Sequence, residues 1–159
     1  MADIVSSEVR SRMMRGIRSR NTKPERFVRS GLHRAGFRFR LNSQITGIKP
    51  DVVLPRWKAA IFVHGCFWHR HAGCRFAYEP KSRQAFWTQK FQQNLARDAR
   101  QYEQLRKAGW RVFVVWECAL RDPVAREKRM ALVAKWIKSR AAHGEASVFP
   151  AARLVRGMD

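Results

Sequence analysis

Acidic residues are scarce in this chain of 159 residues. Only 12 aspartates and glutamates stand against 33 lysines and arginines, which gives a formal net charge of +21. The positive surplus is spread along the chain rather than gathered in one tail. Such a charge favours a polyanionic partner, above all a nucleic acid, and it predicts binding that weakens steeply as the salt concentration rises.

Long hydrophobic runs are absent as well, and the first residues lack the pattern of a secretory signal peptide. No stretch is long and apolar enough for a membrane-spanning helix. We therefore expect no membrane partner and a cytoplasmic location. Because the chain is short and has no internal repeats, we expect a single domain over residues 1–159.

Cysteine is rare, and the positions of the three that occur fit a metal site in a reducing cytoplasm. Cys66, His71 and Cys74 have the spacing C-x4-H-x2-C, and Cys118 ends a second apolar run at residues 112–116. Three thiolates and one imidazole form a closed tetrahedral set, which is typical of structural zinc and takes no part in hydrolysis. The alternative is three buried free thiols beside a surface histidine.

Two more histidines, His64 and His69, lie within the same stretch and are not needed by the zinc set. Asp51 begins a short β-branched strand, and the next strand ends in His64. Both side chains can then lie side by side at one end of a sheet, where they could hold Mg²⁺ and activate water. The alternative for Asp51, which follows Pro50, is an ordinary turn residue.

Hydrophobic periodicity predicts an α/β fold. Helices are expected at residues 7–20, between Thr22 and Gly36, at 83–107 and at 122–142, and strands at 37–41, 51–54, 59–64 and 110–116. The first three strands are expected to form a meander, with the fourth added after a helical crossover. Thr22 and Glu25 form a capping-box pattern, which explains Glu25 without catalysis. Residues 143–159 are expected to form a tail of low order.

Several separated blocks of the chain together resemble the very short patch repair (Vsr) family of DNA mismatch endonucleases. These blocks are residues 21–25 (NTKPE), 50–51 (PD), 62–69 (FVHGCFWH), 86–87 (FW), 110–112 (WRV) and 116–120 (WECAL), and they span roughly residues 10–120. The resemblance implies a restriction-endonuclease-like fold, with a central mixed sheet flanked by helices and a structural zinc site. It also implies a Mg²⁺-dependent enzyme.

The implied reaction is the nicking of one DNA strand 5′ to the mispaired thymine of a T:G mismatch. The partner would be double-stranded DNA that carries this mismatch, together with proteins of a repair pathway. We expect a monomer, because nicking one strand needs a single active site. The expected location is the bacterial cytoplasm, at the nucleoid.

The resemblance implies catalytic roles for five residues. Asp51 would bind Mg²⁺ with the backbone carbonyl of Val63, and Glu25 would reach the metal through water. His69 would activate the attacking water, and His64 would assist near the phosphate. Many members of the family carry threonine in place of Val63, but a ligand supplied by the backbone tolerates that change.

The resemblance also implies that the helix at residues 7–20 contacts the minor groove of DNA, where Met14 would wedge between base pairs. This helix is basic and amphipathic, with five arginines beside a narrow apolar stripe. A methionine on such a stripe is more often part of the core.

Five further residues would contact DNA around the mismatch. Phe67 and Trp68 lie on the loop next to Cys66 and would insert from the major groove, and Trp87 would join this wedge. Lys90 and Asn94 would lie against the mispaired bases. The alternatives are core packing for the three aromatic residues and a solvated helix surface for the other two.

Two competing functions remain open at this point. One is a restriction-type or general nickase of the same fold that acts on unmodified or otherwise damaged duplex. The other is a zinc-stapled DNA-binding module without catalysis. The presence of Asp51, His64 and His69 argues against the second.

Overall fold

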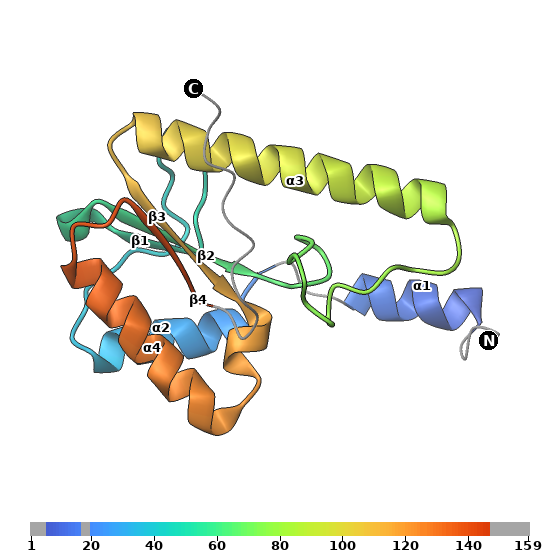
Figure 1. Cartoon of the computed structure of the whole chain (residues 1–159), viewed down its shortest axis with the longest axis horizontal. Helices are drawn as coiled ribbons and strands as arrows, with labels where there is room; N and C mark the ends of the chain where they lie inside the picture. Colours follow the sequence, from blue (N-terminus) through green and yellow to red (C-terminus); the bar gives the residue numbers. More distant parts are fainter. Residues whose placement is uncertain (1–5, 17–19, 147–159) are drawn as a thin grey trace.

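One four-stranded mixed sheet forms the centre of the molecule (Figure 1). The structure is a computed structural model that describes residues 6–16 and 20–146. The strands are adjacent in chain order: β1 (Val52–Leu54), β2 (Ala59–His64), β3 (Arg111–Trp116) and β4 (His143–Ala146). β1 is antiparallel to β2, and the other two pairings are parallel, which confirms the predicted mixed sheet.

Two helices, α2 (Lys23–Arg34) and α4 (Pro123–Lys138), cover one face of this sheet. Val28 of α2 and Val133 of α4 are completely buried in the core that the two helices share with the strands. The helices approach closely at Gly31, where an added Cβ atom would lie 2.9 Å from the Cε atom of Met130. The predicted cap at Thr22 is confirmed, since its side chain accepts a hydrogen bond from the backbone N–H of Glu25 at the start of α2, whereas Glu25 accepts in return from the backbone N–H of Asn21 rather than of Thr22.

The long helix α3 (Gln84–Lys107) covers the opposite face. Leu105 and Tyr102, near its C-terminal end, pack on Phe62 and Val114 of the sheet. The N-terminal half of α3 extends past the end of the sheet, above the loop that follows β2 (Figure 1). The helix α1 (Ser7–Gly16) lies beyond the same end and buries none of its residues. α3, α1 and the loop therefore surround one end of the sheet.

The segment at residues 37–41 does not form the predicted strand. Only Arg40 pairs with the sheet, through an isolated antiparallel bridge to Val53. Phe37 is buried in the core instead. Asn42 has a positive φ of 54° and turns the chain away directly after the bridge. The predicted meander is thus correct for β1 and β2, whereas its first strand is reduced to one residue.

The prediction of a tail of low order from residue 143 is wrong for its first four residues, which form β4. These residues include no β-branched or aromatic side chain, so the strand carries no local signal. It forms because its backbone pairs with β3 and because Gly144 lets the strand lie against Phe113 and Trp136.

Some expected segments reach beyond the residues that the structure describes. Residues 17–19 of the predicted N-terminal helix and residues 147–159 of the predicted tail are among them. Within the described residues, α4 ends at Lys138, four residues before its predicted end. None of the described helices has the length and apolar character needed to cross a bilayer.

Replacement of Gly144 by alanine is expected to destabilise the protein. The added Cβ atom would lie 2.6 Å from Cδ2 of Phe113 and 2.8 Å from Cδ1 of Trp136, and both rings are buried. Overpacking of this kind should lower the free energy of unfolding by about 1–3 kcal/mol. Urea unfolding measures the effect, with Gly16→Ala as the control because nothing lies within 4 Å of its added Cβ atom. Equal stability of both variants would contradict the packing of β4 described here.

Candidate active site and metal centre

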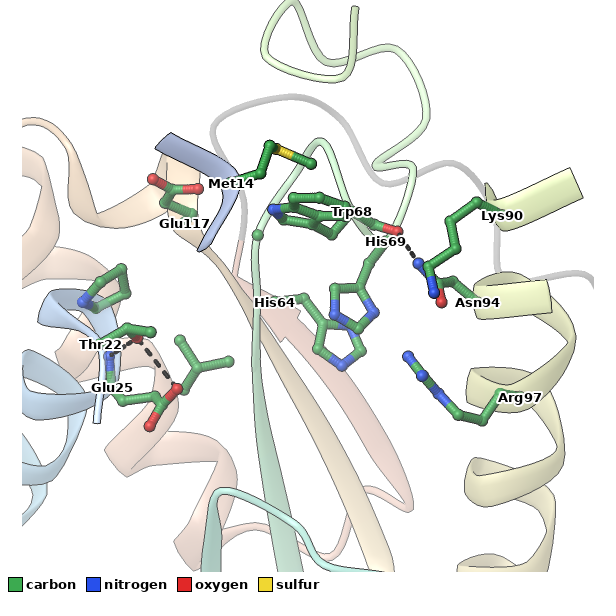
Figure 2. A pocket seen from close by; sticks show the side chains of 13 residues that line it. Met14, Thr22, Glu25, His64, Trp68, His69, Lys90, Asn94, Arg97 and Glu117 are labelled. Carbon is green, nitrogen blue, oxygen red and sulfur yellow. Dashed lines mark hydrogen bonds between the residues drawn. The ribbon is translucent and has the colours of Figure 1, made fainter. Parts of the chain in front are cut away.

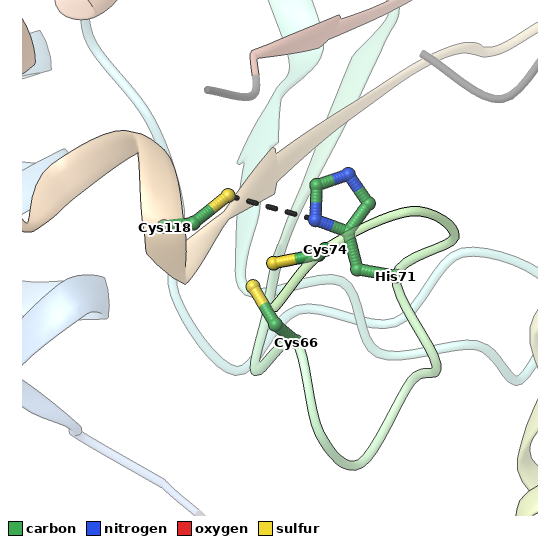
Figure 3. A group of neighbouring side chains, drawn as sticks. All are labelled: Cys66, His71, Cys74 and Cys118. Carbon is green, nitrogen blue, oxygen red and sulfur yellow. Dashed lines mark hydrogen bonds between the residues drawn. The ribbon is translucent and has the colours of Figure 1, made fainter. Parts of the chain in front are cut away.

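Four side chains converge where the loop after β2 meets the end of β3 (Figure 3). The ligand atoms of Cys66, His71, Cys74 and Cys118 lie within 4.8 Å of one another, and all four residues are buried. The Nδ1 atom of His71 is 3.5 Å from the Sγ atom of Cys118. Ligand atoms at these separations fit around one tetrahedral zinc ion, whose bonds measure about 2.0–2.3 Å. The cluster therefore fits the predicted structural zinc site.

Local turns bring the first three ligands together. The backbone N–H of His71 donates to the carbonyl of Cys66, and that of Cys74 donates to the carbonyl of His71. Cys118 comes from the short 3-10 helix Glu117–Leu120, directly after β3. Hydrogen bonding to Cys118 and burial raise the pKa of the Cys66 thiol. A metal ion bound here must therefore displace protons from the thiols.

A cleft of about 680 Å³ opens at the same end of the sheet, between α2 and α3 (Figure 2). Trp116 connects it to the cysteine cluster. The indole ring of Trp116 stacks on His71 at a centroid distance of 4.2 Å and meets His64 edge-on at 5.5 Å. The residues that line the cleft are Met14, Thr22, Pro24, Glu25, Val63, His64, Gly65, Trp68, His69, Lys90, Asn94, Arg97 and Glu117.

His64 and His69 lie in the cleft with their rings stacked at a centroid distance of 3.7 Å. The Nδ1 atom of His69 is 2.6 Å from Oδ2 of Asp98, a buried residue of α3. Because an ionised carboxylate only accepts hydrogen bonds, Nδ1 of His69 is the donor in this pair, and in the neutral ring the lone pair is then on Nε2. Burial holds the pKa of His64 well below its ordinary value, and the neighbouring His69 and Arg97 lower it further. His64 is therefore neutral near pH 7.

Asp51 lies at the start of β1, beside the end of β2. Its Oδ2 atom accepts a hydrogen bond of 2.7 Å from the backbone N–H of Val63. Burial raises the pKa of Asp51 to about 6, although this hydrogen bond opposes the shift. The charges of Glu25 and His69 also act on Asp51. The structure thus gathers Asp51, Val63, His64, His69 and Glu25, the five residues predicted to take part in catalysis.

Glu25 is 6% exposed and belongs to the α2 wall of the cleft. Its carboxylate accepts hydrogen bonds from the backbone N–H of Asn21, from the hydroxyl of Thr22 and from Arg29. These contacts account for the buried charge, because each carboxylate oxygen has a donor. They also fix Glu25 close enough to Asp51 for the two charges to repel each other.

Sequence reasoning missed Asp98, Tyr102 and Arg97, which all come from α3. The hydroxyl of Tyr102 lies 3.1 Å from Nδ1 of His64. Arg97 lines the cleft, with its Nη2 atom 3.4 Å from Oδ1 of Asp98. Asp98 and Tyr102 continue the four-residue spacing of Lys90 and Asn94, so they lie on the same helix face. Extending that spacing by two further steps would have found them.

The residues predicted to contact DNA divide into two groups. Met14, Trp68 and Lys90 line the cleft near its mouth (Figure 2). Asn94 also lines it, but Asn94 is buried and its amide donates a 2.9 Å hydrogen bond to the carbonyl of Trp68. Asn94 therefore holds the loop that carries Trp68.

Phe67 and Trp87 lie in a cluster of aromatic rings next to the cleft. The ring of Phe67 contacts Trp68, Tyr78, Trp87 and Phe91 at centroid distances between 4.9 and 5.3 Å. Neither Phe67 nor Trp87 lines the cleft itself. Both are half-buried, so they support Trp68 from behind while keeping part of each ring exposed.

The chain is similar to known proteins in both sequence and fold. A sequence model described as DNA mismatch endonuclease Vsr matches residues 2–75. The type II nicking enzyme V.XorIIP of Xanthomonas oryzae is 48% identical over 130 residues, which cover 82% of this chain and 95% of that protein. The type II nicking enzyme V.NmeAIP of Neisseria meningitidis is 41% identical and covers 87% of this chain and 98% of its own length.

Two other similarities add to these. The DNA mismatch endonuclease Vsr of Escherichia coli is 41% identical over 121 residues, which cover 76% of this chain and 77% of that protein. The catalytic domain of the homing endonuclease I-Bth0305I aligns with a TM-score of 0.50 and 20% identity, over 75% of this chain and all of that domain. This last likeness concerns the fold alone.

The raised pKa of Asp51 predicts that Asp51→Asn stabilises the protein when no Mg²⁺ is present. Above pH 6 the folded protein holds an ionised carboxylate in a half-buried site, whereas asparagine keeps the acceptor for Val63 without the charge. The free energy of unfolding at about pH 7.5 should rise on the order of 1–3 kcal/mol. The gain should shrink as pH falls through 6 and vanish only below the ordinary pKa of 3.8, where Asp51 is neutral in both the folded and the unfolded state. Urea unfolding at several pH values checks this, and a gain that persists at low pH would contradict it.

Proposed function

The chain belongs to the Vsr family and is a DNA-nicking endonuclease, and from this premise we propose that it nicks one strand 5′ to the mispaired thymine of a T:G mismatch. One observation supports a hydrolytic site best. At the end of β2, the half-buried carboxylate of Asp51 lies close enough to His69 for the two charges to interact, and the ring of His69 is fixed by Asp98. A carboxylate for a metal ion beside an oriented base is the arrangement that phosphodiester hydrolysis needs.

Asp51 and the backbone carbonyl of Val63 would hold Mg²⁺. In an antiparallel strand the N–H and C=O of one residue point to the same neighbouring strand. Because the N–H of Val63 donates to Asp51, its carbonyl lies on that same side. Oxygen ligands of this kind suit Mg²⁺, and Glu25 would hold water molecules around it. When bound, Mg²⁺ would lower the pKa of the attacking water and offset charge on the phosphate.

His69 acts as the general base in this proposal. Its Nε2 atom accepts the proton of the attacking water, because Nδ1 is committed to Asp98. Asp98 holds the ring in this tautomer and stabilises the positive charge that the ring gains. His64 stays neutral and stacks on His69, which keeps the ring of the base in place.

Arg97 supplies a positive charge to the phosphate. Many nucleases with a restriction-endonuclease-like fold carry a second acid and a lysine after the metal-binding aspartate, whereas this chain has Phe62, Val63 and His64 on that strand. Arg97 lines the cleft from the opposite wall, beside Asp98. A guanidinium group can contact two phosphate oxygens at once, so Arg97 can replace the missing lysine.

Recognition of the mismatch would take place at the mouth of the cleft. Trp68 and Met14 lie close together there and come from different segments of the chain (Figure 2), so an aromatic wedge and an apolar wedge can enter opened DNA together. Phe67 and Trp87 brace Trp68. Lys90 can donate to the carbonyl oxygens of mispaired bases.

The names of the relatives in Xanthomonas and Neisseria support a second candidate target. Both are called type II nicking enzymes, so this chain can instead be a restriction-type nickase that cuts matched duplex. The two candidate functions use the same catalytic residues. They differ only in the kind of DNA duplex into which Trp68 and Met14 insert. A purely DNA-binding role is not supported.

The first prediction of this proposal is strand-specific, mismatch-dependent nicking. Zinc-loaded protein should cut a labelled duplex with one T:G pair, only on the thymine strand and only with Mg²⁺. The same duplex with T:A in that position should stay intact, because a matched pair resists insertion of Trp68 and Met14. Denaturing gel electrophoresis with each strand labelled in turn measures both the strand and the position.

A panel of matched and mismatched duplexes is the control for target choice. Equal nicking of T:A and T:G duplexes would overturn the mismatch proposal in favour of a restriction-type nickase. Cutting without Mg²⁺ would overturn the metal assignment at Asp51 and leave the target unaffected.

The second prediction concerns the pair of His69 and Asp98. Asp98→Asn should lower the nicking rate about 10²–10⁴-fold, because an amide can donate to Nδ1 and so place the proton on Nε2 of His69. Affinity for uncut duplex should change little. Asp122→Asn is the matched control: it removes one carboxylate from the surface, and asparagine caps α4 equally well. Single-turnover nicking rates make the comparison, and a rate for Asp98→Asn equal to that of the control would exclude the base assignment.

A further inference from the structure

We infer that Glu145 of β4 is an outer member of the zinc site, whose carboxylate lies beside Nε2 of His71 and favours a proton on that nitrogen. The Oε1 atom of Glu145 lies 3.6 Å from Nε2 of His71. The side chain of His71 is 2% exposed and that of Glu145 is 16% exposed. Both groups are thus largely shielded from water, where a carboxylate next to an imidazole has a strong effect.

The two nitrogens of His71 face different partners. Nδ1 points to the thiols, with Cys118 at 3.5 Å, and so is the atom that would bind the metal. A neutral imidazole that binds a metal through Nδ1 carries its proton on Nε2. The carboxylate of Glu145 is next to that Nε2 atom, so it favours the tautomer that leaves Nδ1 free for zinc. Metal-bound histidines commonly donate their second N–H to a carboxylate in this way.

The register of the sheet explains why Glu145 reaches the cluster. Glu145 pairs with Val114 of β3, and Gly144 pairs with Phe113. Neighbours across a parallel pairing share one face, and successive residues alternate between faces. Phe113 belongs to the core under α2 and α4, whereas Val114 packs on the α3 face. Glu145 therefore lies on the α3 face, the side on which His71 stacks on Trp116.

The imidazole of His71 is consequently fixed from two directions. Trp116 covers one face of the ring at an interplanar angle of 7°, and Glu145 meets its Nε2 edge. Both residues come from the sheet rather than from the loop that carries His71. The strands thus set the orientation of a ligand that the loop supplies.

The rate of zinc release tests this inference. Zinc-loaded protein is mixed with excess of a chromophoric chelator, and the absorbance of the zinc–chelator complex is followed with time. Glu145→Ala should release zinc about 10–100-fold faster than the unchanged protein. Glu145→Gln keeps an acceptor for Nε2–H without the charge, so its rate should fall between the two. Glu127→Gln, an exposed glutamate of α4 paired with Arg34, should behave as the unchanged protein.

Gly144→Ala is the control that distinguishes an effect of the Glu145 carboxylate on zinc release from an effect of the packing of β4. This variant perturbs β4 next to Phe113 but keeps Glu145. If it released zinc as fast as Glu145→Ala, strand packing rather than the carboxylate would be responsible, and the inference would be overturned. Release at the unchanged rate from both Glu145 variants, or protein that binds no zinc, would overturn it too.

Cobalt(II) in place of zinc provides a second readout. The visible absorption bands of tetrahedral cobalt report the four ligands, so Glu145→Gln should keep the band pattern with small shifts. A change to a pattern with one ligand fewer would contradict an outer role. The inference rests on the proposed zinc site, but no DNA is involved in either measurement. Its failure would leave the nicking proposal intact, and a failure to nick mismatched DNA would leave zinc release unaffected.

Discussion

The attachment of the loop after β2 to the end of β3 is the constraint on which the candidate active site depends. Cys66 and His71 lie on either side of the catalytic candidate His69, and Cys118 joins them from the far end of β3. A loop with few apolar residues of its own could not hold His69 and Trp68 in one place, because the entropy of the free loop opposes it. A metal ion at the cluster would offset that entropy directly. Reactive and structural groups therefore share one short segment.

The second support of the site is the rigid wall that α3 provides. Groups spaced by four residues project from it, and each holds a different part of the opposing surface. Asn94 binds the backbone of the loop, Asp98 binds His69, and the hydroxyl of Tyr102 lies against His64. Since helix geometry fixes the spacing of these contacts, a rotation or shift of α3 would disturb all of them together. The site is thus assembled on a loop that lies between α3 and the end of the sheet.

The sequence predicted the parts of the molecule that leave a local pattern. The α/β architecture with its mixed sheet, the helix cap at Thr22 and the convergence of three cysteines with His71 all follow from spacing or periodicity, or from the family resemblance. The sequence did not predict β4, because this strand forms through its pairing with β3 and not through its residue types. The four-residue spacing from Asn94 places Asp98 on the same face of the helix, but its role depends on His69, which comes from another segment. Contacts between distant segments set both features.

The order of the functional residues along the chain has a consequence for synthesis. Asp51, His64, His69 and Asp98 all precede Cys118, so a growing chain carries every catalytic candidate before it has the fourth zinc ligand. β3, the parallel partner of β2 at the centre of the sheet, also lies in the later part of the sequence. The cluster that joins the loop with His69 to the end of β3 is therefore complete only after the segment around Cys118 has been made. Until then, the contacts from α3 to Trp68 and His69 are the ones that can hold this loop during synthesis.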